Sequence, residues 1–410
     1  MKVLFLQFGT KYYSFENNHY TDGSLNEKVW NRYFKYANRL TVIGKKASDK
    51  KNTVDKNRLN VVPSNINLIL LEDLYNPKRN YFNLKKRNQI YKEISNQIDN
   101  NDKIVIRSLT NDYNLYAAKY CLKKKKDFVV EVTGFGFGSL WYHDKVFGKI
   151  MAFLVESRMK KIIKKCPHVL YVTESSLQKK YPNNNHNEGC SDVEIELDES
   201  IIAEKMKKYM DSFDIKNIKV GTIGPVDSKL KGQKYVIKAL SRLNKKYGYN
   251  IKYELVGRGD NSYLKSIAHK YSFDNNISFI GELNHNKIFE WIDSIDVYIQ
   301  PSFQEGLCRS IVEAMSRGCI VFASNAGGNV ELISSKYVFK KGKTCQIIKL
   351  FEDLKKEDIK NIIDEEYKIA QEYEKNKLNV KRNSFYDNFF ELKINTENKT
   401  KDKPSIIVEN

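Results

Sequence analysis

PSFQEGLCRSIVEAM, the stretch Pro301–Met315, follows a strand-like apolar run and opens a short helix that Gly318 closes. It places Glu305 on a loop and Glu313 on the first turns of the helix. The backbone N–H groups at the start of that helix have no partner inside it and can therefore bind an anion. Two carboxylates that accept hydrogen bonds from hydroxyls beside such a helix start indicate a hydroxyl-rich ligand that carries phosphate.

On both sides of this stretch, short apolar runs alternate with segments of helical periodicity. This alternation predicts parallel sheets with helices on both faces, which is the α/β class. It loosens between Asn183 and Lys216, which we interpret as the region between two domains. We expect ligands to bind at the carboxyl ends of the strands, in a cleft between two Rossmann-like domains. The predicted parts are an N-terminal domain at 1–195, a C-terminal domain at 196–375, a helix at 376–395 that packs back on the N-terminal domain, and a polar tail at 396–410.

The chain is long and basic. Its 410 residues exceed one ordinary core, and 70 Lys and Arg against 50 Asp and Glu give a formal net charge of +20. This charge favours anionic partners such as nucleotides, nucleic acid or an anionic membrane. The alternative is that it reflects only Lys-rich surfaces, because the Lys residues are spread along the chain. The Cys residues form no CxxC pair, and no apolar run reaches the roughly 20 residues of a membrane span. We therefore expect reduced thiols in a cytoplasmic protein.

Several motifs together resemble the family-four glycosyltransferases of GT-B fold, and among them a bacterial branch that builds capsular or surface polysaccharide. The main one is Pro301–Met315, followed by Arg317–Gly318 and by GGNVEL at 327–332. The branch tends to read EGLPR where this chain reads EGLCR. Weaker matches are GPVDSKLKG at 224–232, ELVGRGD at 254–260, FIGEL at 279–283, YVTESSLQKKYP at 171–182 and GCSDV at 189–193.

The resemblance implies a hexosyltransferase that moves a sugar from a nucleotide diphosphate sugar to a glycan acceptor, with retention at the anomeric carbon and without metal or cofactor. It implies that Glu305 holds the donor sugar and stabilises positive charge in the transition state. Lys231 would neutralise the diphosphate leaving group, and Glu313 would bind the ribose hydroxyls. The other residues expected on the donor side are Gly224, Gly257, Gly306, Leu307 and Ser310.

One departure from the family concerns the diphosphate. The family usually has an Arg just after the glycine of the Lys231 loop, and this chain has Pro225 there. Either the contact is lost or another cation replaces it. Our hypothesis is that Arg309, at the start of the Glu313 helix, takes over part of the contact, with Lys229 as the second candidate.

A second departure lies in the N-terminal half, where many relatives place a His after the strand equivalent to residues 129–132. This chain has GFGFG at 134–138, whose last glycine is at the wrong spacing for a nicotinamide dinucleotide. We interpret Gly134–Asp144 as a loop that faces the cleft. His143 is then either the cleft histidine or an ordinary histidine, and Glu131 is either a cleft acid or a strand-end carboxylate.

The acceptor side is expected near the end of the first strand, where the family often has a glycine-rich loop. Here a long loop with many aromatic residues follows Gly9, and its rings either stack on sugar faces or simply decorate the surface. The residues that we assign to the acceptor side are Gly9, Tyr12, Tyr13 and Gly136, with Tyr20 and Trp30 as further aromatic candidates.

The segment Val146–Lys165 has apolar residues at helical spacing and Lys residues opposite them. It either packs on its own sheet or lies on an anionic membrane, where it would bring the enzyme to a polyprenyl-diphosphate-linked acceptor at the inner face of the cell membrane. Three alternatives to a glycosyltransferase stay open at this point. They are another reaction at the same diphosphate site, a catalytically silent homologue that binds glycan or a partner enzyme, and, ranked last, a nucleic-acid binder, since the basic residues form no patch with interleaved aromatics.

Overall fold

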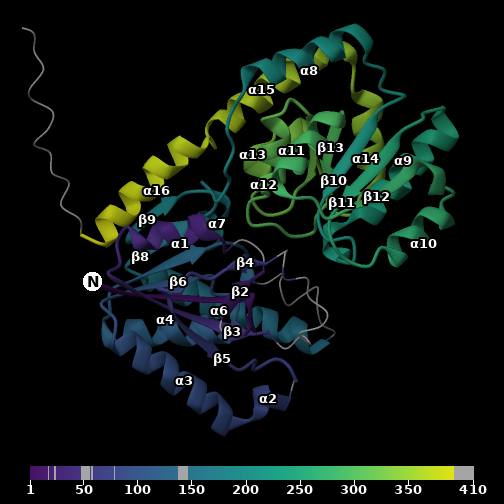
Figure 1. Ribbon diagram of the computed structural model, residues 1–410. Helices are drawn as coiled ribbons and strands as arrows, with labels where there is room; N and C mark the ends of the chain where they lie inside the picture. Colours follow the sequence, from purple (N-terminus) through teal and green to yellow (C-terminus); the bar gives the residue numbers. More distant parts are fainter. Residues whose placement is uncertain are drawn as a thin grey trace, which may run out of the picture.

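The computed structural model describes residues 1–391 except 17, 23–24, 48–55, 57–58, 78 and 137–145, and it describes only the backbone at 146–151. Figure 1 shows two lobes, each built on a twisted sheet with helices packed around it, and long helices that run along one side from one lobe to the other. The first sheet comes from the N-terminal half of the chain and the second from the C-terminal half. The predicted α/β class with two Rossmann-like sheets is confirmed.

The N-terminal sheet has β1 near its centre, paired in parallel with β3 on one side and with β6 on the other. Beyond them it continues through β5 at one end and through β7, β8 and β9 at the other. The described strands of this sheet are β1 Lys2–Phe15, β2 Asn18–Thr21, β3 Arg39–Lys46, β4 Asn60–Val61, β5 Asn67–Leu71, β6 Lys103–Arg107, β7 Phe128–Val132, β8 His168–Tyr171 and β9 His186–Gly189.

Helices cover both faces of this sheet, so the central strands are buried on both sides. All positions of β6 and β7 are buried, as expected for parallel strands between two helical layers. The helices of this half are α1 Glu27–Phe34, α2 Arg79–Phe82, α3 Leu84–Asp99, α4 Asp112–Lys124, α6 Val146–Lys165 and α7 Ser176–Lys180.

The C-terminal sheet is parallel at every described pairing, in the order β12-β11-β10-β13-β14-β15. Its first strand along the chain, β10, lies in the middle, and the chain direction across the sheet reverses between β10 and β13. This reversal is the topological switch point of a Rossmann fold, where ligands bind at the carboxyl ends of the strands. The strands are β10 Lys219–Ile223, β11 Lys252–Val256, β12 Ile277–Gly281, β13 Val297–Gln300, β14 Ile320–Ser324 and β15 Val338–Phe339.

A helix that the sequence did not reveal precedes this sheet. We interpreted 183–216 as the region between the two domains, and residues 199–212 within it form α8. The Asp198 side chain caps the helix by accepting a hydrogen bond from the N–H of Ser200, and Lys205 and Tyr209 are buried under it. The helices of this half are α8 Glu199–Ser212, α9 Gln233–Tyr247, α10 Ser262–Lys270, α11 His285–Ser294, α12 Arg309–Met315, α13 Asn329–Leu332, α14 Thr344–Asp353, α15 Ile359–Gln371 and α16 Lys375–Phe389.

The last helix, α16, returns to the N-terminal lobe, as Figure 1 shows in yellow. The ring of Phe390 stacks on Tyr36 with centroids 4.4 Å apart, and Phe389 meets His168 edge to face at 5.1 Å. The Tyr386 hydroxyl donates a hydrogen bond to Glu131 at the end of β7. The chain therefore connects the lobes twice, once before α8 and once before α16.

The prediction of an acceptor loop with exposed aromatic residues is wrong. β1 continues to Phe15 and turns into β2, with which Tyr12–Phe15 pairs in antiparallel fashion. The Tyr12 ring is fully buried against Gly44, where a Cβ atom would collide with it. Tyr13 and Tyr20 of the hairpin and Trp30 of α1 are buried as well, so these rings are not presented to a sugar.

The segment Val146–Lys165 is helical, as predicted. Its residues Val155, Met159 and Ile163 are buried in the core of the N-terminal lobe, whereas Phe153 and Leu154 are 60% and 44% exposed. Packing on its own sheet thus accounts for one face of α6. Among the described residues, every helix is too short or too polar to serve as a membrane-spanning segment.

Glu366 of α15 yields a prediction about stability. It is 3% exposed, and among the described residues its carboxylate accepts one hydrogen bond, from the N–H of Val321 at 3.3 Å. Burial raises the pKa of Glu366 well above its ordinary value. Because the pKa of Glu366 is higher in the folded state than in the unfolded state, its contribution to stability is complete at pH values below the unfolded pKa. This contribution is lost as the pH rises through the folded-state pKa. We expect Glu366→Gln to be more stable than wild type near neutral pH, with a gap that grows by about 1.4 kcal/mol per pH unit from the unfolded pKa, roughly 4.3, up to the raised folded-state pKa.

Urea unfolding across that pH range measures the gap. Glu365→Gln is the matched control, because its side chain is exposed on the same helix and should show no such trend. A gap that stays constant with pH would contradict the assignment of a neutral, buried Glu366.

Candidate functional site

The switch point of the C-terminal sheet brings together the two charged groups predicted from the sequence. The loop after β10 carries Lys231, at the end of a short 3-10 helix, Lys229–Lys231. The loop after the neighbouring strand β13 carries Glu305. Lys231 Nζ lies 2.6 Å from Glu305 Oε1, although the two residues are 74 positions apart in the sequence. The strand order alone makes this contact, because both loops leave the sheet at the same edge.

Glu305 is held in place through one of its two oxygens. Besides the bond from Lys231, Oε1 accepts hydrogen bonds from Ser302 Oγ at 2.6 Å and from Gln300 Nε2 at 3.1 Å. Both of these donors are fully buried. Within the part of the chain that the structure describes, no hydrogen bond to Oε2 is found, so this second oxygen is available to a ligand.

The ion pair also sets the charge state of Lys231. Burial alone would lower the pKa of Lys231, but the nearby Glu305 carboxylate outweighs it and raises that pKa above its ordinary value. The lysine thus stays charged in a half-buried position, with 24% of its side chain exposed.

Glu313 and Arg309 lie one turn apart on α12. Burial raises the pKa of Glu313, and the positive charges of Arg309 and His285 oppose this rise. Among the described residues, no hydrogen bond to the Glu313 carboxylate is found. Arg309 is exposed and lines the cleft, whereas Lys229 stands over the ring of Tyr263 at 5.0 Å and does not line it. Of the two candidates for the missing arginine, Arg309 is therefore the better placed.

Two glycines allow the loops of the site to approach other backbone closely. A Cβ atom at Gly306 would collide with the carbonyl oxygen of Thr133, which belongs to the other lobe. Gly257 has a φ of +153° and would collide with the carbonyl oxygen of Gly224. A side chain at either position would push apart the loops that carry the charged residues.

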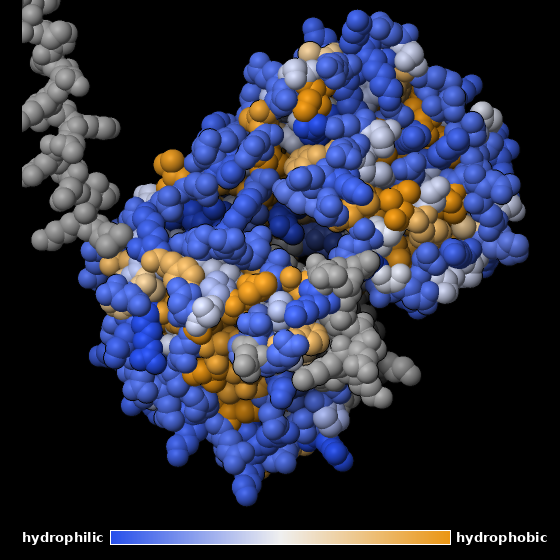
Figure 2. Space-filling model, viewed as in Figure 1, coloured by the Kyte–Doolittle hydropathy of each residue, from blue (hydrophilic) through white to orange (hydrophobic). Residues whose placement is uncertain are grey.

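A cavity of about 680 Å³ opens between the lobes and joins these residues into one site. Figure 2 shows the surface hollowed between the lobes, with mainly hydrophilic residues around the hollow. The predicted residues that line the cavity are Gly224, Lys231, Glu305, Leu307, Arg309, Ser310 and Glu313. The predicted residues that do not line it are Gly9, Tyr12, Tyr13, Gly136, Lys229, Gly257 and Gly306, and His143 lies outside the described residues.

Comparison with known proteins identifies the family. Residues 211–377 match the family model described as Glycosyl transferases group 1. Protein CapJ of Staphylococcus aureus is 31% identical over 387 residues, which cover 93% of this chain and 91% of CapJ. The chain belongs to the group 1 glycosyltransferases.

Two further comparisons concern one curated relative and one solved structure. CapH of Staphylococcus aureus, a capsular polysaccharide biosynthesis glycosyltransferase, is 31% identical over 105 residues, or 25% of this chain and 29% of CapH. The solved structure of Anabaena HepE in complex with UDP and glucose superposes with a TM-score of 0.60 at 16% identity, covering 94% of this chain and 99% of HepE. At this identity the likeness shows the fold, and the predicted GT-B fold is confirmed.

The N-terminal wall of the glycosyltransferase cleft contains residues that the sequence did not point to as a group. It includes Lys28 and Arg32 of α1, Arg107 at the end of β6, and Asp192. Asp192 belongs to the GCSDV motif, but its arginine partners come from distant segments. For Glu131 the sequence left two alternatives, a cleft acid or a strand-end carboxylate. The structure supports the strand-end carboxylate, because Glu131 is 2% exposed and is bonded to Arg107 and to two Tyr hydroxyls.

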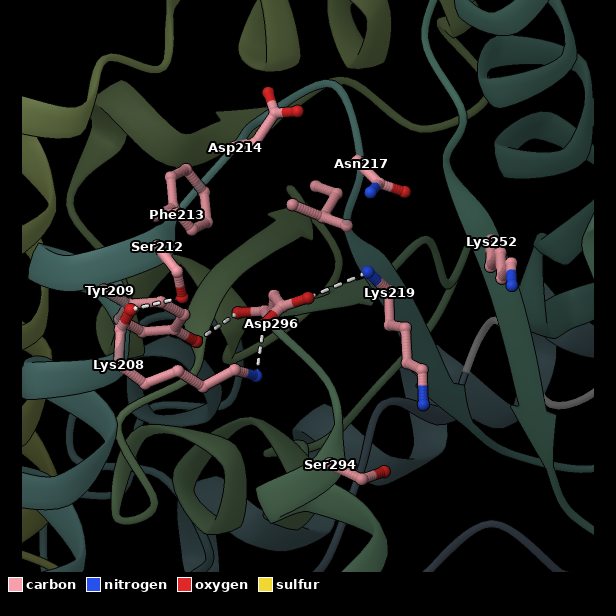
Figure 3. A pocket seen from close by; sticks show the side chains of 11 residues that line it. Lys208, Tyr209, Ser212, Phe213, Asp214, Asn217, Lys219, Lys252, Ser294 and Asp296 are labelled. Atoms are coloured by element: carbon pink, nitrogen blue, oxygen red, sulfur yellow. Dashed lines mark hydrogen bonds and ion pairs between the residues drawn. The ribbon is translucent and has the colours of Figure 1, made fainter.

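A second, smaller hollow lies away from the glycosyltransferase cleft, at the amino ends of the C-terminal strands (Figure 3). Asp296 is at its centre and already has protein partners for both oxygens, the Lys208 ammonium at 3.1 Å and the N–H of Lys219 at 2.9 Å. Tyr209 donates to the Asp296 carbonyl at 2.9 Å. These bonds tie α8 to the sheet, so we interpret this hollow as structural.

Glu331 of α13 makes hydrogen bonds that connect the two lobes of the glycosyltransferase. Its carboxylate accepts hydrogen bonds of 2.9–3.1 Å from the N–H groups of Glu174, Ser175 and Ser176 and from both Ser hydroxyls. These groups lie at the start of α7 in the other lobe, where a negative charge is favourable. Nearby, Gln304 Nε2 donates to the carbonyl of Phe135 at 2.8 Å.

We expect Glu331→Ala to loosen this connection. The donors at the start of α7 lose their shared acceptor, which should lower the free energy of unfolding by about 1–3 kcal/mol and increase the radius of gyration. Urea unfolding and small-angle X-ray scattering measure the two effects. Val330→Ala, at the neighbouring position that is 48% exposed, is the control. If Glu331→Ala matches this control in both measurements, Glu331 does not hold the lobes together.

Proposed function

We propose that this glycosyltransferase transfers a hexose from a UDP-hexose to a lipid-linked glycan in capsular polysaccharide synthesis, with retention and without a metal. The observation that carries the proposal is the Lys231–Glu305 ion pair at the switch point of the C-terminal sheet. The relatives support the finer points, since CapH is a capsular polysaccharide glycosyltransferase and HepE was solved with UDP and glucose.

The chemistry of the reaction explains why this pair suits it. Breaking the bond between the sugar and the diphosphate leaves negative charge on the diphosphate and positive charge on the anomeric carbon. Lys231 would meet the first charge, and the free oxygen of Glu305 would meet the sugar and the second charge. Because Glu305 Oε1 is held by Lys231, Ser302 and Gln300, little reorganisation is needed at the moment of reaction.

The rest of the donor would lie along α12. The Glu313 carboxylate, which has no hydrogen bond among the described residues, is proposed to accept the ribose hydroxyls. Arg309, on the adjacent turn, is proposed to contact the diphosphate together with the N–H groups at the start of the helix. These roles divide the cavity into a sugar end at Glu305 and a nucleoside end at Glu313.

The lipid-linked acceptor is supported by the surface of α6. Phe153 and Leu154 are exposed there, and the same helix exposes Lys160, Lys161 and Lys164. Exposed apolar residues beside several Lys side chains suit contact with an anionic membrane, which would bring the cleft to a carrier lipid.

Donor binding tests the proposed function directly. A panel of nucleotide sugars is added to the protein and the melting temperature is measured, because a ligand that binds the folded state raises it. We expect UDP-hexoses to raise it. We expect Glu313→Ala to weaken UDP-hexose binding by about 10- to 100-fold, through loss of hydrogen bonds to a charged group. Glu290→Ala, an exposed carboxylate on α11, is the control.

If no nucleotide sugar stabilises the wild type, the proposed function is wrong. The alternative, a catalytically silent homologue, is favoured by Pro225 at the place of the usual diphosphate arginine. It predicts that a bound UDP-hexose is never cleaved, so release of UDP on long incubation would exclude it.

The cation on the diphosphate can be identified by comparing UDP with uridine. We expect Arg309→Ala to weaken UDP binding about tenfold, as for a lost charge-assisted hydrogen bond, while its affinity for uridine stays unchanged. Lys229→Ala should bind both ligands like the wild type. Isothermal titration calorimetry measures the affinities of the wild type and both variants for UDP and for uridine. An unchanged UDP affinity in Arg309→Ala, with a loss in Lys229→Ala, would assign the contact to Lys229 instead.

A further inference from the structure

A cluster of charged residues on the N-terminal wall of the cleft has an excess of positive charge. It contains the guanidinium groups of Arg32, Arg107 and Arg382 and the carboxylates of Glu131 and Asp192. Three cations thus share two anions. The residues come from α1, β6, α16, β7 and the loop after β9, so the cluster exists only in the folded chain.

Both oxygens of Glu131 already have protein partners. One oxygen accepts hydrogen bonds from the hydroxyls of Tyr33, at 2.5 Å, and Tyr386, and the other is paired with Arg107. Burial alone would raise the pKa of Glu131, but Arg107 and Arg32 lower it, so the group is an anion. Its charge is matched by Arg107, the arginine to which it is bonded.

Asp192 is shared unequally among the three arginines. Arg107 Nη2 donates to it at 2.5 Å, whereas the nearest nitrogens of Arg32 and Arg382 are 3.7 and 3.9 Å away. Arg382 has other acceptors, the carbonyl of Ser191 at 2.5 Å and the side chain of Asn379 at 3.1 Å. The cation with the weakest hold on a protein acceptor is therefore Arg32.

Arg32 combines burial with unused hydrogen-bond donors. Its side chain is 13% exposed, and it lines the cleft on the same face of α1 as Lys28 and Val29. Among the described residues, the Arg32 guanidinium has an ion pair with Asp192 at 3.7 Å, and no hydrogen bond from it is found. Its unbonded N–H groups face the solvent of the open cleft, and a ligand that displaces this solvent has to supply acceptors in its place. Carboxylate and phosphate match its planar fork.

We propose that Arg32 binds an oxyanion on the acceptor, a carboxylate of a uronic acid or a phosphate next to the acceptor sugar. The inference rests on the proposed function, because it takes the N-terminal wall as the acceptor side of a sugar-transfer site. Lys28 on the same wall is paired with Glu194 at 3.1 Å. The donor already has Lys231 and Arg309 on the opposite wall, so Arg32 is assigned to the second substrate. Arg32 thereby selects acidic acceptors over neutral ones.

The test uses protein saturated with UDP, so that the cations of the C-terminal lobe are occupied. Glucuronate, inorganic phosphate and glucose are titrated separately at constant ionic strength, and binding is followed by the melting temperature. We expect the wild type to bind at least one of the two anions and to bind glucose more weakly. Arg32→Gln should weaken anion binding about tenfold and leave UDP binding unchanged.

Lys35→Gln is the matched control, since it removes an equal charge just after α1, where Lys35 pairs with Asp387 outside the cleft. It should bind the anions like the wild type. If Arg32→Gln does not fold, as judged by the lack of a cooperative melting transition without ligand, Arg32→Lys replaces it and should also lose affinity, because the ammonium lacks the planar fork.

The two anions distinguish the sources of the acidic group. A loss confined to glucuronate assigns the site to a carboxylated sugar, and a loss confined to phosphate assigns it to a phosphate on the acceptor. Equal anion affinities in wild type and Arg32→Gln overturn the inference, as does a loss of UDP affinity in Arg32→Gln, which would place Arg32 on the donor. Failure of UDP to bind the wild type would instead contradict the proposed function.

Discussion

The ion pair between Lys231 and Glu305 depends on the order of the strands in the C-terminal sheet. The two residues follow β10 and β13, which are neighbours only because the chain first builds β11 and β12 on one side of β10 and then crosses to the other. A parallel sheet sends both loops out at one edge, so the opposite charges meet there. Partly buried charges are costly when unpaired. The pair therefore links the topology of the whole domain to the chemistry of its cleft.

Several directional contacts join the two lobes beside the cleft. Glu331 of α13 holds the start of α7, Gln304 reaches the carbonyl of Phe135, and Gly306 lets the Glu305 loop touch Thr133. Gln304 and Gly306 are the chain neighbours of Glu305 in the site. A change in the angle between the lobes would therefore move the cleft residues directly, and the return of α16 limits how far the lobes can separate.

The sequence predicted the features that depend on local pattern. Buried parallel strands read as apolar runs, and a loop acid followed by a helix acid is visible as spacing in EGLCRSIVE. It did not predict that Tyr12 lies in the core, because a hairpin strand and an aromatic loop have similar composition and only the packing against Gly44 distinguishes them. Helix α8 was missed because its buried face includes Lys205, which breaks the apolar periodicity. The partners of Asp192 could not be predicted, since Arg32, Arg107 and Arg382 are brought to it by three separate long-range crossings.

The two walls of the cleft differ in how their positive charge is held. On the C-terminal wall Lys231 is paired with Glu305, whereas Arg309 is exposed and no hydrogen bond or ion pair with it is found among the described residues. On the N-terminal wall three arginines lower the pKa of Asp192 so that it stays ionised, and Glu131 and Asp192 offset two of the three guanidinium charges. In the proposed reaction each wall would therefore offer one arginine to a substrate, Arg309 to the donor and Arg32 to the acceptor, so that two anionic substrates could occupy the cleft without sharing a cation.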